Sequence, residues 1–242
     1  MTTTGRNGRL GNQIIRNLAV SLIAEKYDLH VDYYNEPLIR KLGIKLFSGS
    51  KIFSHTIPLT DDNYFSTFNS ENLNANLNPN HHYFQTLPIT NLLHTYLHSD
   101  KIKANIIESN PFRARYNANN DLYIHIRLTD VKQHSPGINY YMNVIKTIHF
   151  DNMYISTDEI SHNIIKEIMN TYPSTKIIEC DEITTFQYAS TCKNIILSHG
   201  SFSALIGYLS FFSTVNYPEY DLNNIWYGDM FSINGWVKHN YT

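Results

Sequence analysis

The chain has 242 residues, of which 42% are hydrophobic and 17% charged, and its formal net charge at pH 7 is -2. This length and composition suit a globular protein of one large domain or two small ones. The near-neutral charge, without a basic run or an acidic tail, excludes a broad electrostatic attraction to nucleic acid or acidic lipid. Two cysteines, Cys180 and Cys192, are too few for a disulfide scaffold and predict free, buried thiols.

The sequence also argues against secretion and membrane insertion. No charged and then apolar leader opens the chain, and the most apolar stretch, residues 201–215, is interrupted by serines. A membrane-spanning helix needs about 20 apolar residues. We therefore expect a soluble, cytoplasmic protein without a membrane span.

The first half of the chain opens on a glycine-rich turn, GRNGRLGNQ, at residues 5–13. Apolar pairs then recur every four residues, which predicts an amphipathic helix at residues 12–27. Residues 29–34 (LHVDYY) predict a strand, and residues 1–4 predict at most a short strand before the glycines. This turn, helix and strand are typical of an α/β protein.

The middle of the chain is polar and less regular. The Asn-rich residues 69–82 predict a long surface loop, and residues 90–106 predict one helix. Residues 110–121, which are polar and contain Pro111, predict a linker between two halves.

The second half alternates regularly between strand and helix patterns. We expect strands at residues 122–127, 153–156, 176–179, 194–198 and 214–218, and helices at residues 139–150, 158–170, 184–191 and 201–212. A capping box of Ser156 and Glu159 would open the helix at residues 158–170. This alternation predicts a parallel, doubly wound sheet, in which ligands bind at the carboxyl ends of the strands.

Arg127 and Asp158 stand at two of these strand ends. The guanidinium of Arg127 can clamp a phosphate with two hydrogen bonds, or it can form an ion pair with Asp130 across the loop. The carboxylate of Asp158 can favour the start of the following helix, or it can accept hydrogen bonds from a base or a sugar.

A third strand end carries small residues, SHGSFS, at residues 198–203. The start of a helix at this point offers backbone N–H groups to an anion, and Ser201 and Ser203 could add hydroxyl donors. The alternative is an ordinary serine N-cap. The tight turn at Gly200 favours the anion site.

Several common motifs are absent. The opening turn is neither G-x-G-x-x-G nor a P-loop, although it suits an oxygen-rich ligand. His94 and His98 share a helix face at metal-binding spacing without an evident third ligand, and there is no H-E-x-x-H or Asp-x-Asp motif. We therefore expect no metal site, and the absence of G-x-S-x-G gives no support to a serine hydrolase.

In their order, several stretches resemble the α-1,2-fucosyltransferase family. GRLGNQIIRNLAVSLI resembles the opening G-x-G-N-Q loop and helix, and HHYFQT resembles a Gly-Tyr-Phe-Gln-Ser segment. HIRLTD resembles the His-x-Arg-Arg-x-Asp motif shared with α-1,6- and protein O-fucosyltransferases, and INYYMNVI resembles the helix that follows it. YISTDEISHNIIKEI and FQYASTCKNIILSHGSFSALIGYLS resemble two later segments, so the resemblance runs almost from end to end.

This resemblance implies a GT-B fold, in which two Rossmann-like domains face each other across a cleft. Residues 1–115 would form the acceptor-side domain, and residues 116–242 would bind the nucleotide sugar GDP-fucose. The implied reaction transfers fucose to a glycan hydroxyl with inversion and without a metal or other cofactor.

The resemblance also implies roles for individual residues. Arg127 would bind the diphosphate, and His125 and Asp158 would lie beside the guanine. Ser201 and Phe202 would sit at the phosphates, and Gly11 and Asn12 would approach the sugar-phosphate. The resemblance assigns no general base; Asp130 could act as one or only orient Arg127. The catalytic candidates are Arg127, Asp130 and Asn12, and the donor-binding candidates are Gly11, Asn12, His125, Arg127, Asp158, Ser201, Phe202 and Ser203.

The chain departs from the family pattern at several positions. Leu128 replaces the second arginine of the motif, His199 and Gly200 replace an Asn-Ser pair, and Ala204 and Leu205 replace paired tryptophans. Two alternatives therefore stay open: the same chemistry with another nucleotide sugar, and a non-catalytic module that binds a glycan or a nucleotide. The loss of a cation at Leu128 favours the second alternative.

Overall fold

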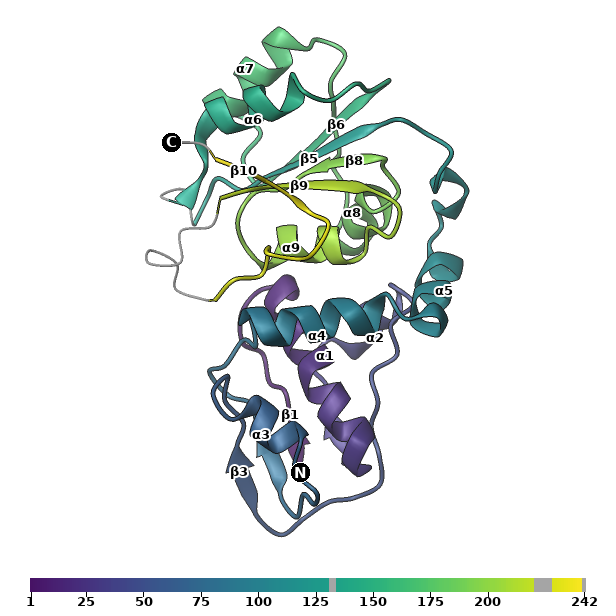
Figure 1. The fold of residues 1–242 in the computed structure, drawn as a ribbon, viewed down its shortest axis with the longest axis vertical. Helices are drawn as coiled ribbons and strands as arrows, with labels where there is room; N and C mark the ends of the chain where they lie inside the picture. The colour runs from purple at the N-terminus through teal and green to yellow at the C-terminus, as the bar shows by residue number, and fades with distance from the viewer. Residues whose placement is uncertain (131–133, 220–227, 241–242) are drawn as a thin grey trace. The chain divides into compact units, whose positions relative to one another are not determined.

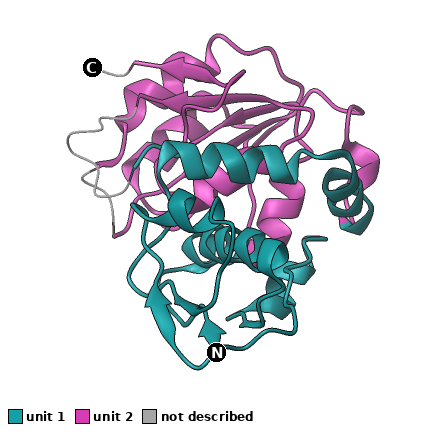
Figure 2. Ribbon diagram, turned by 60° about the horizontal axis from the view of Figure 1, so that its bottom comes forward, with its two compact units in different colours: residues 1–109, 226–230 teal, residues 110–225, 231–242 magenta. Residues whose placement is uncertain are grey.

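The computed structural model describes residues 1–130, 134–219 and 228–240. Two compact units make up the chain (Figure 2). Unit 1 comprises Met1–Ser109 with Trp226–Met230, and unit 2 comprises Asn110–Ile225 with Phe231–Thr242. The change of unit at Ser109 precedes the predicted boundary at residue 115, and the later stretch of unit 1 had no counterpart in the prediction.

A six-stranded parallel sheet forms the centre of the described part of unit 2 (Figure 1). Its spatial order is β10-β9-β8-β5-β6-β7. In chain order the strands are β5 (Leu122–Ile126), β6 (Met153–Thr157), β7 (Lys176–Ile177), β8 (Asn194–Ile196), β9 (Thr214–Pro218) and β10 (Val237–His239). The chain winds outward from β5 in one direction and from β8 in the other, so the predicted doubly wound parallel sheet is confirmed. The edge strand β10 was not predicted.

Helices cover both faces of this sheet. Figure 1 shows α6 (Gly137–Ile145) and α7 (Asn163–Thr171) on one face, and α8 (Glu182–Ala189) and α9 (Ser201–Tyr208) on the other. All residues of β5 are buried, as expected for a central strand covered on both sides.

The alternation along β5 directs its side chains to these two helical layers. Leu122, Ile124 and Ile126 join the apolar core that includes α6 and α7 residues. His125 points to the opposite face, where it contacts α9. The predicted alternation therefore places His125 on the side of α9.

One predicted helix begins later than expected. Helix α7 begins at Asn163, with His162 as its N-cap, so the prediction of a helix from residue 158 with a capping box is wrong. The N–H of Glu159 instead donates to Thr157 Oγ1, and the carboxylate of Glu159 accepts from Ser161. These local hydrogen bonds hold the segment in turns.

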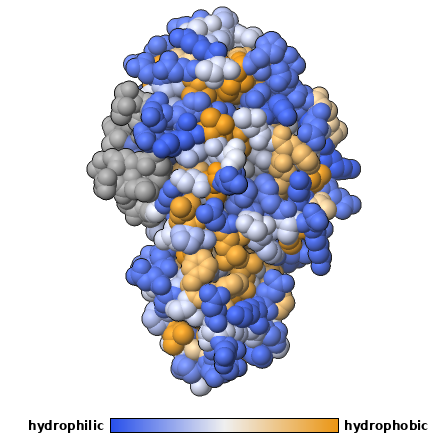
Figure 3. Space-filling model, in the orientation of Figure 1, coloured by the Kyte–Doolittle hydropathy of each residue, from blue (hydrophilic) through white to orange (hydrophobic). Residues whose placement is uncertain are grey.

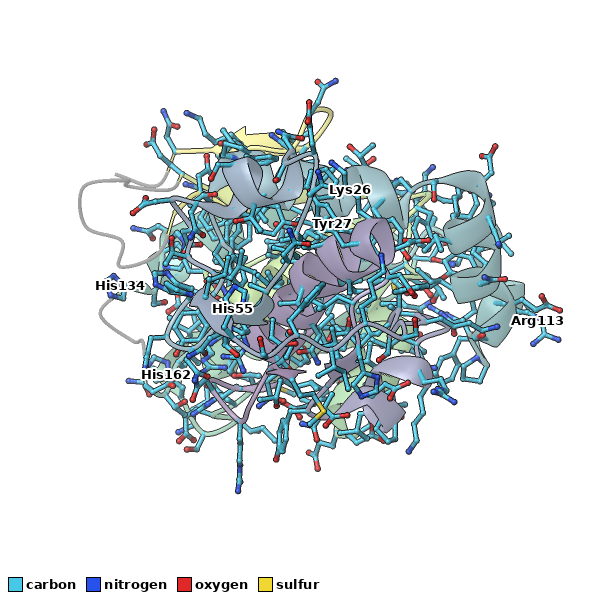
Figure 4. The ribbon with its side chains drawn as sticks, turned by 90° about the horizontal axis from the view of Figure 1, so that it is seen from below. Lys26, Tyr27, His55, Arg113, His134 and His162 are labelled. Atoms are coloured by element: carbon cyan, nitrogen blue, oxygen red, sulfur yellow. The ribbon has the colours of Figure 1, made fainter. Side chains whose placement is uncertain are left out.

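Unit 1 is built from short parallel strand pairs and helices. β1 (Thr2–Thr3) pairs with β2 (Val31–Asp32), and β3 (Thr56–Pro58) pairs with β4 (Asn76–Asn78). Its helices are α1 (Leu10–Tyr27), α2 (Glu36–Arg40), α3 (Tyr64–Phe68), α4 (Leu87–Leu97) and α5 (Asp100–Ser109). Lys26 and Tyr27, labelled in Figure 4 at the end of α1, donate hydrogen bonds to the last carbonyls of α3.

Two expectations for the middle of the chain are wrong. Residues 69–82 are not wholly a surface loop, because Asn76 and Leu77 are buried in β4. The amide of Asn76 bonds the backbone of Phe53 and His55, which satisfies a polar side chain inside the unit. Residues 90–106 form parts of two helices, because α4 ends at Leu97.

The segment predicted as a linker, residues 110–121, belongs to unit 2. It contains the short 3-10 helix η1 (Arg113–Arg115), and both Asn110 and Asp121 are buried.

Both cysteines are free as predicted, but Cys180 is exposed and only Cys192 is buried.

The surface is mostly hydrophilic on the face drawn in Figure 3. The large hydrophobic residues that are exposed, Met1, Ile52, Ile160 and Val237, are scattered along the sequence. Of the helices described, none is long and apolar enough to cross a membrane.

Candidate functional site

The polar strand ends of unit 2 lie at neighbouring positions in the sheet. β5 pairs with β6 on one side and with β8 on the other, so the residues after these three strands share one edge. The winding of the chain reverses between β5 and β8, which is where ligands bind in doubly wound sheets. Arg127 follows β5, Asp158 follows β6 and Ser198 follows β8.

Arg127 is held between two carboxylates. Its Nε lies 3.1 Å from Asp158 Oδ2 and 3.1 Å from Asp130 Oδ1, and its Nη2 lies 2.5 Å from the same Asp130 oxygen. The Arg127 side chain is 17% exposed and that of Asp130 is 47% exposed. The ion pair between Arg127 and Asp130 is therefore present, and Asp130 is its solvent-facing partner.

Asp158 holds the loop that follows β5. Its Oδ1 accepts from the backbone N–H of Leu128 at 2.8 Å, and its Oδ2 accepts from Thr129 Oγ1 at 2.6 Å. Burial alone would raise the pKa of Asp158, but the hydrogen bonds from Thr129 and Leu128 and the charge of Arg127 lower it. The carboxylate is ionised and bonds the loop after the neighbouring strand. Of its two predicted roles, the one at the start of a helix is wrong, and the contact with a base or a sugar stays a prediction.

His125 is enclosed rather than exposed at this edge. The residue is 6% exposed, and the centre of its ring lies 5.0 Å from that of Phe202, which stacks on Phe186. Burial, followed by the charge of Arg127, lowers the pKa of His125 to about 3. The imidazole is therefore neutral at physiological pH, and its proposed contact with guanine stays a prediction.

Ser203 connects His125 to the end of β8. Its Oγ accepts from the N–H of Ser198 at 2.9 Å and lies 2.7 Å from His125 Nδ1, to which it can donate its own proton. Ser198 Oγ in turn accepts from the N–H of Arg127 at 3.2 Å. These bonds join the ends of β5 and β8 to the first turn of α9.

The start of α9 has an open glycine as its N-cap. Gly200 has φ of 97° and ψ of 161°, which only glycine adopts readily, and no atom of the described residues lies within 4 Å of the position that a Cβ would occupy. No side chain caps the helix, so the alternative of a serine N-cap is wrong. Ser201 and Phe202 lie in the first turn, whose N–H groups have no acceptor within the helix.

The position of the missing second arginine belongs to the core. Leu128 is 3% exposed and packs with residues of β5, β6 and α6. The site therefore has one arginine at the end of β5, and the next residue, Leu128, is buried among apolar side chains.

The two predicted site residues of the first half lie in the first turn of α1. Gly11 is buried, and Asn12 Oδ1 accepts from Gln85 Nε2 at 2.8 Å. The structure thus brings together two stretches that the resemblance had quoted separately, GRLGNQ and HHYFQT. Gln85, Thr129 and Ser198 were not assigned roles from the sequence, although Gln85 lies inside a quoted motif.

No metal cluster occurs among the residues described: nowhere do three or more His, Cys, Asp or Glu side chains gather in a suitable arrangement. The rings of His94 and His98 stack with their centroids 3.9 Å apart on α4.

Comparison with known proteins supports the fold. No family model matches the sequence, and no curated protein matches it. A solved structure of the E. coli heptosyltransferase WaaC with ADP-2-deoxy-2-fluoro heptose is similar, with a TM-score of 0.51 and 8% sequence identity. The similarity covers 96% of this chain and 90% of that chain. The chain therefore has the α/β fold of GT-B glycosyltransferases, as predicted, whereas these comparisons do not identify the α-1,2-fucosyltransferase family.

Proposed function

We propose that the protein is an inverting, metal-independent glycosyltransferase that transfers fucose from GDP-fucose to a glycan hydroxyl. The observation that carries this proposal is the position of Arg127, at the switch point of the sheet and bonded through its N–H to the end of β8. The glycosyltransferase fold and the order of the quoted motifs support it.

Departure of GDP develops negative charge on the β-phosphate. A fixed guanidinium and the N-terminus of α9 would stabilise this charge without a metal. Asp158 fixes the Nε edge of Arg127 and the loop after β5, so little reorganisation is required there. In this mechanism the diphosphate takes the place of the exposed Asp130 on Nη2. The resemblance assigns Gly11 and Asn12 to the sugar-phosphate of the donor as well.

Asp130 has two possible roles that one substitution separates. As an orienting residue, it competes with the diphosphate for Arg127, so Asp130→Asn would tighten GDP binding and preserve turnover. As the general base, it accepts the acceptor's proton, so the same variant would lose turnover by a factor of about 100 or more.

Two specific observations favour the alternatives. The structurally similar heptosyltransferase was solved with an ADP-sugar analogue, which supports a nucleotide sugar other than GDP-fucose. The buried Leu128 and the pairing of Arg127 with two carboxylates support a binding module without catalysis. We also infer a cytoplasmic location, which the two free cysteines support.

A ligand panel tests the proposal. Thermal shift with GDP, GDP-fucose, UDP, UDP-sugars and ADP-sugars should show selective stabilisation by the guanine nucleotides. Transfer of labelled fucose to a glycan array should then proceed equally in EDTA. Stabilisation by only UDP or ADP compounds contradicts the donor, loss of transfer in EDTA contradicts metal independence, and binding without transfer or hydrolysis supports the binding module.

A further inference from the structure

Two loops of unit 1 leave the same edge of its paired strands. β3 and β4 run parallel, and Asp61 follows β3 while His82 follows β4. In parallel α/β sheets, ligands bind at the carboxyl ends of the strands. The position of this aspartate and this histidine in unit 1 therefore corresponds to that of Arg127 after β5 in unit 2.

The glycine-rich turn packs along the loop after β4. A Cβ at Gly5 would lie 3.6 Å from Asn80 Oδ1. A Cβ at Gly8 would lie 2.9 Å from the ring of Tyr83. The buried Arg16 of α1 donates to the carbonyl of Gly5, which holds the turn in place. The loop that carries the histidine therefore lies beside two residues that have no side chain, where a ligand can approach the backbone closely.

His82 and Asp61 form an oriented pair. His82 Nδ1 lies 2.8 Å from Asp61 Oδ2 and 3.3 Å from the backbone nitrogen of Asp61. The shorter contact decides which ring nitrogen is protonated, because two acceptors without a proton between them would repel each other. Nδ1 therefore carries the proton and donates to the carboxylate, and Nε2 of the neutral ring has a lone pair.

The lone pair of His82 is available to a ligand. Nε2 has no hydrogen-bond partner anywhere in the described ranges of the chain, and the His82 side chain is 34% exposed. A histidine whose Nδ1 is held by a carboxylate and whose Nε2 is open has the arrangement of a general base.

The loop that carries Asp61 is fixed by its own hydrogen bonds. The N–H of Thr60 donates to Asn63 Oδ1 at 2.7 Å, and the N–H of Asn63 donates to Thr60 Oγ1 at 3.1 Å. Asn63 Nδ2 also donates to the carbonyl of Pro58, the last residue of β3, at 2.9 Å. The aspartate is thus held in position before a substrate binds, as precise orientation of a base requires.

Another histidine beside an aspartate in unit 1 lacks this arrangement. His30 Nδ1 lies 3.2 Å from the carbonyl oxygen of Gly49, and its Nε2 lies 3.8 Å from Asp32 Oδ1. Both ring nitrogens of His30 therefore face a partner, and neither is open to a substrate. This pair serves as the structural reference for the pair after β3 and β4.

We propose that His82 is the general base of the transfer and that Asp61 is its positioning residue. This inference rests on the proposed function and names the group that takes the acceptor's proton. The acceptor oxygen forms a bond to the anomeric carbon of fucose, while the bond from that carbon to the β-phosphate oxygen breaks and its electron pair leaves with GDP. The hydroxyl proton passes to Nε2, the carboxylate stabilises the imidazolium, and the ring then releases the proton to water. Asp130 keeps only the role of orienting Arg127.

Kinetics of His82→Ala separate catalysis from donor binding. We expect kcat to fall by a factor of about 100 or more, as for the loss of a general base, with the Kd for GDP unchanged. Imidazole added to the solution should restore part of the lost turnover, because the removed ring was accessible. His55→Ala is the matched control, since His55 is an exposed histidine before β3 (Figure 4) and should keep full turnover with or without imidazole.

The protonation of the ring can be measured without turnover. In the 15N-labelled wild-type chain, at a pH at which the ring is neutral, His82 should carry its proton on Nδ1. Asp61→Asn should lose this preference and lower kcat about tenfold or more with KM unchanged, within the range for general-base catalysis. Asp32→Asn, at an exposed aspartate, should change neither. A wild-type ring protonated on Nε2 overturns the proposal.

Failure of this assignment is distinguishable from failure of the proposed function. Equal transfer of fucose by the wild-type chain and by His82→Ala overturns the base and leaves the proposed function standing. Transfer of another sugar, with the same loss in His82→Ala, contradicts the fucose donor and supports the base. A wild-type chain that transfers no sugar contradicts both. If His82→Ala does not fold, His82→Gln and the protonation of the wild-type ring decide.

Discussion

An arginine and a carboxylate meet at each end of β5, but the carboxylates at the two ends differ in how fully they are enclosed, whereas the Arg115 side chain (26% exposed) is no more enclosed than that of Arg127 (17% exposed). Before the strand, Arg115 Nη2 lies 2.7 Å from Asp121 Oδ2, and the Asp121 side chain is 4% exposed. After the strand, Arg127 contacts Asp158 and also Asp130, which is 47% exposed.

The amino end is a closed network. Asp121 also accepts from Asn152 at 2.9 Å, and the guanidinium of Arg115 lies 4.3 Å from the centre of the Tyr188 ring. Burial alone would lower the pKa of Arg115, but its hydrogen bond to Asp121 and its contact with Cys192 raise it above the ordinary value. Asp121 is thus buried among partners of its own unit, although Asn152 is exposed, as expected where a pair serves stability.

The carboxyl end has a more exposed carboxylate. The exposed carboxylate of Asp130 bonds the guanidinium of Arg127, and Gly200 is the N-cap of α9 at the same edge of the sheet. Under the proposed function, the same ion chemistry serves the fold at one end of the strand and ligand binding at the other. Enclosure and position in the sheet, rather than residue type, distinguish the two ends.

The largest expected effect separates the two arginines by stability. Arg115→Ala leaves Asp121 buried without its cation, so the free energy of unfolding should fall by about 3–5 kcal/mol. GDP affinity of the folded fraction should stay unchanged. Urea unfolding measures the loss, with Arg113→Ala as the control because Arg113 points outward from η1 (Figure 4). An equal loss of unfolding free energy in Arg115→Ala and Arg113→Ala would contradict a structural role for the ion pair before β5.

Asp158→Asn should affect both stability and binding. The neutral amide no longer matches both Thr129 and Arg127, so about 2 kcal/mol of stability should be lost, as for hydrogen bonds to charged groups. Loosening of the loop should weaken GDP binding about tenfold or more. The control is Asp151→Asn, an exposed aspartate before β6. A loop that stays ordered, with unchanged GDP affinity, would contradict the positioning role of Asp158.

Acid should weaken the carboxyl end of β5 through His125. The pKa of this buried ring is lowered to about 3 in the folded chain, against an ordinary value of about 6.5 when unfolded. The stability that the neutral ring contributes is present above pH 6.5 and is lost as the pH falls from 6.5 toward 3, by about 2 kcal/mol at pH 5. Unfolding at pH 7 and pH 5 measures this slope, which should become shallower in His125→Asn. An unchanged slope in that variant would refute the assignment.

Gly200→Ala should have the smallest effect on stability. The backbone conformation is costly for alanine, but no atom of the part of the chain that the structure describes opposes the added methyl group, so about 1 kcal/mol is expected, at the low end for such strain. The methyl group would also lie at the start of α9, so the loss of binding free energy for GDP should exceed the loss of unfolding free energy. Thermal shift with and without GDP compares the two, and a loss of stability alone would argue against an anion at α9.

The regular alternation in the second half made most of unit 2 predictable. Buried strands such as β5 and β6 are mostly apolar and are bounded by polar turns. The position of Arg127 at the end of a strand follows directly from that pattern. The edge strand β10 was missed because it has three residues and two of them are exposed. The nearby Trp236 packs against Gly207, where a Cβ would collide with the Trp236 ring. No local sequence pattern predicts that contact.

The roles of charged residues were less predictable than their positions. A carboxylate after a strand usually favours the helix that follows it, but Asp158 instead bonds Leu128 and Thr129, which are distant in sequence. The buried Arg16 and Gln85 also depend on contacts between separate segments. Such pairings arise only when the strands and turns assemble, so the sequence pattern could not specify them.

Calorimetric titration of GDP into the wild-type chain and into Arg127→Ala tests the central claim most directly, with Arg113→Ala as the control. The charge-assisted hydrogen bonds from one guanidinium to a diphosphate are worth about 1.5–3 kcal/mol each, so Kd should rise at least tenfold in Arg127→Ala. The melting temperature of the unliganded variant should change little. Equal GDP affinity in all three chains would show that the carboxyl end of β5 does not bind the diphosphate.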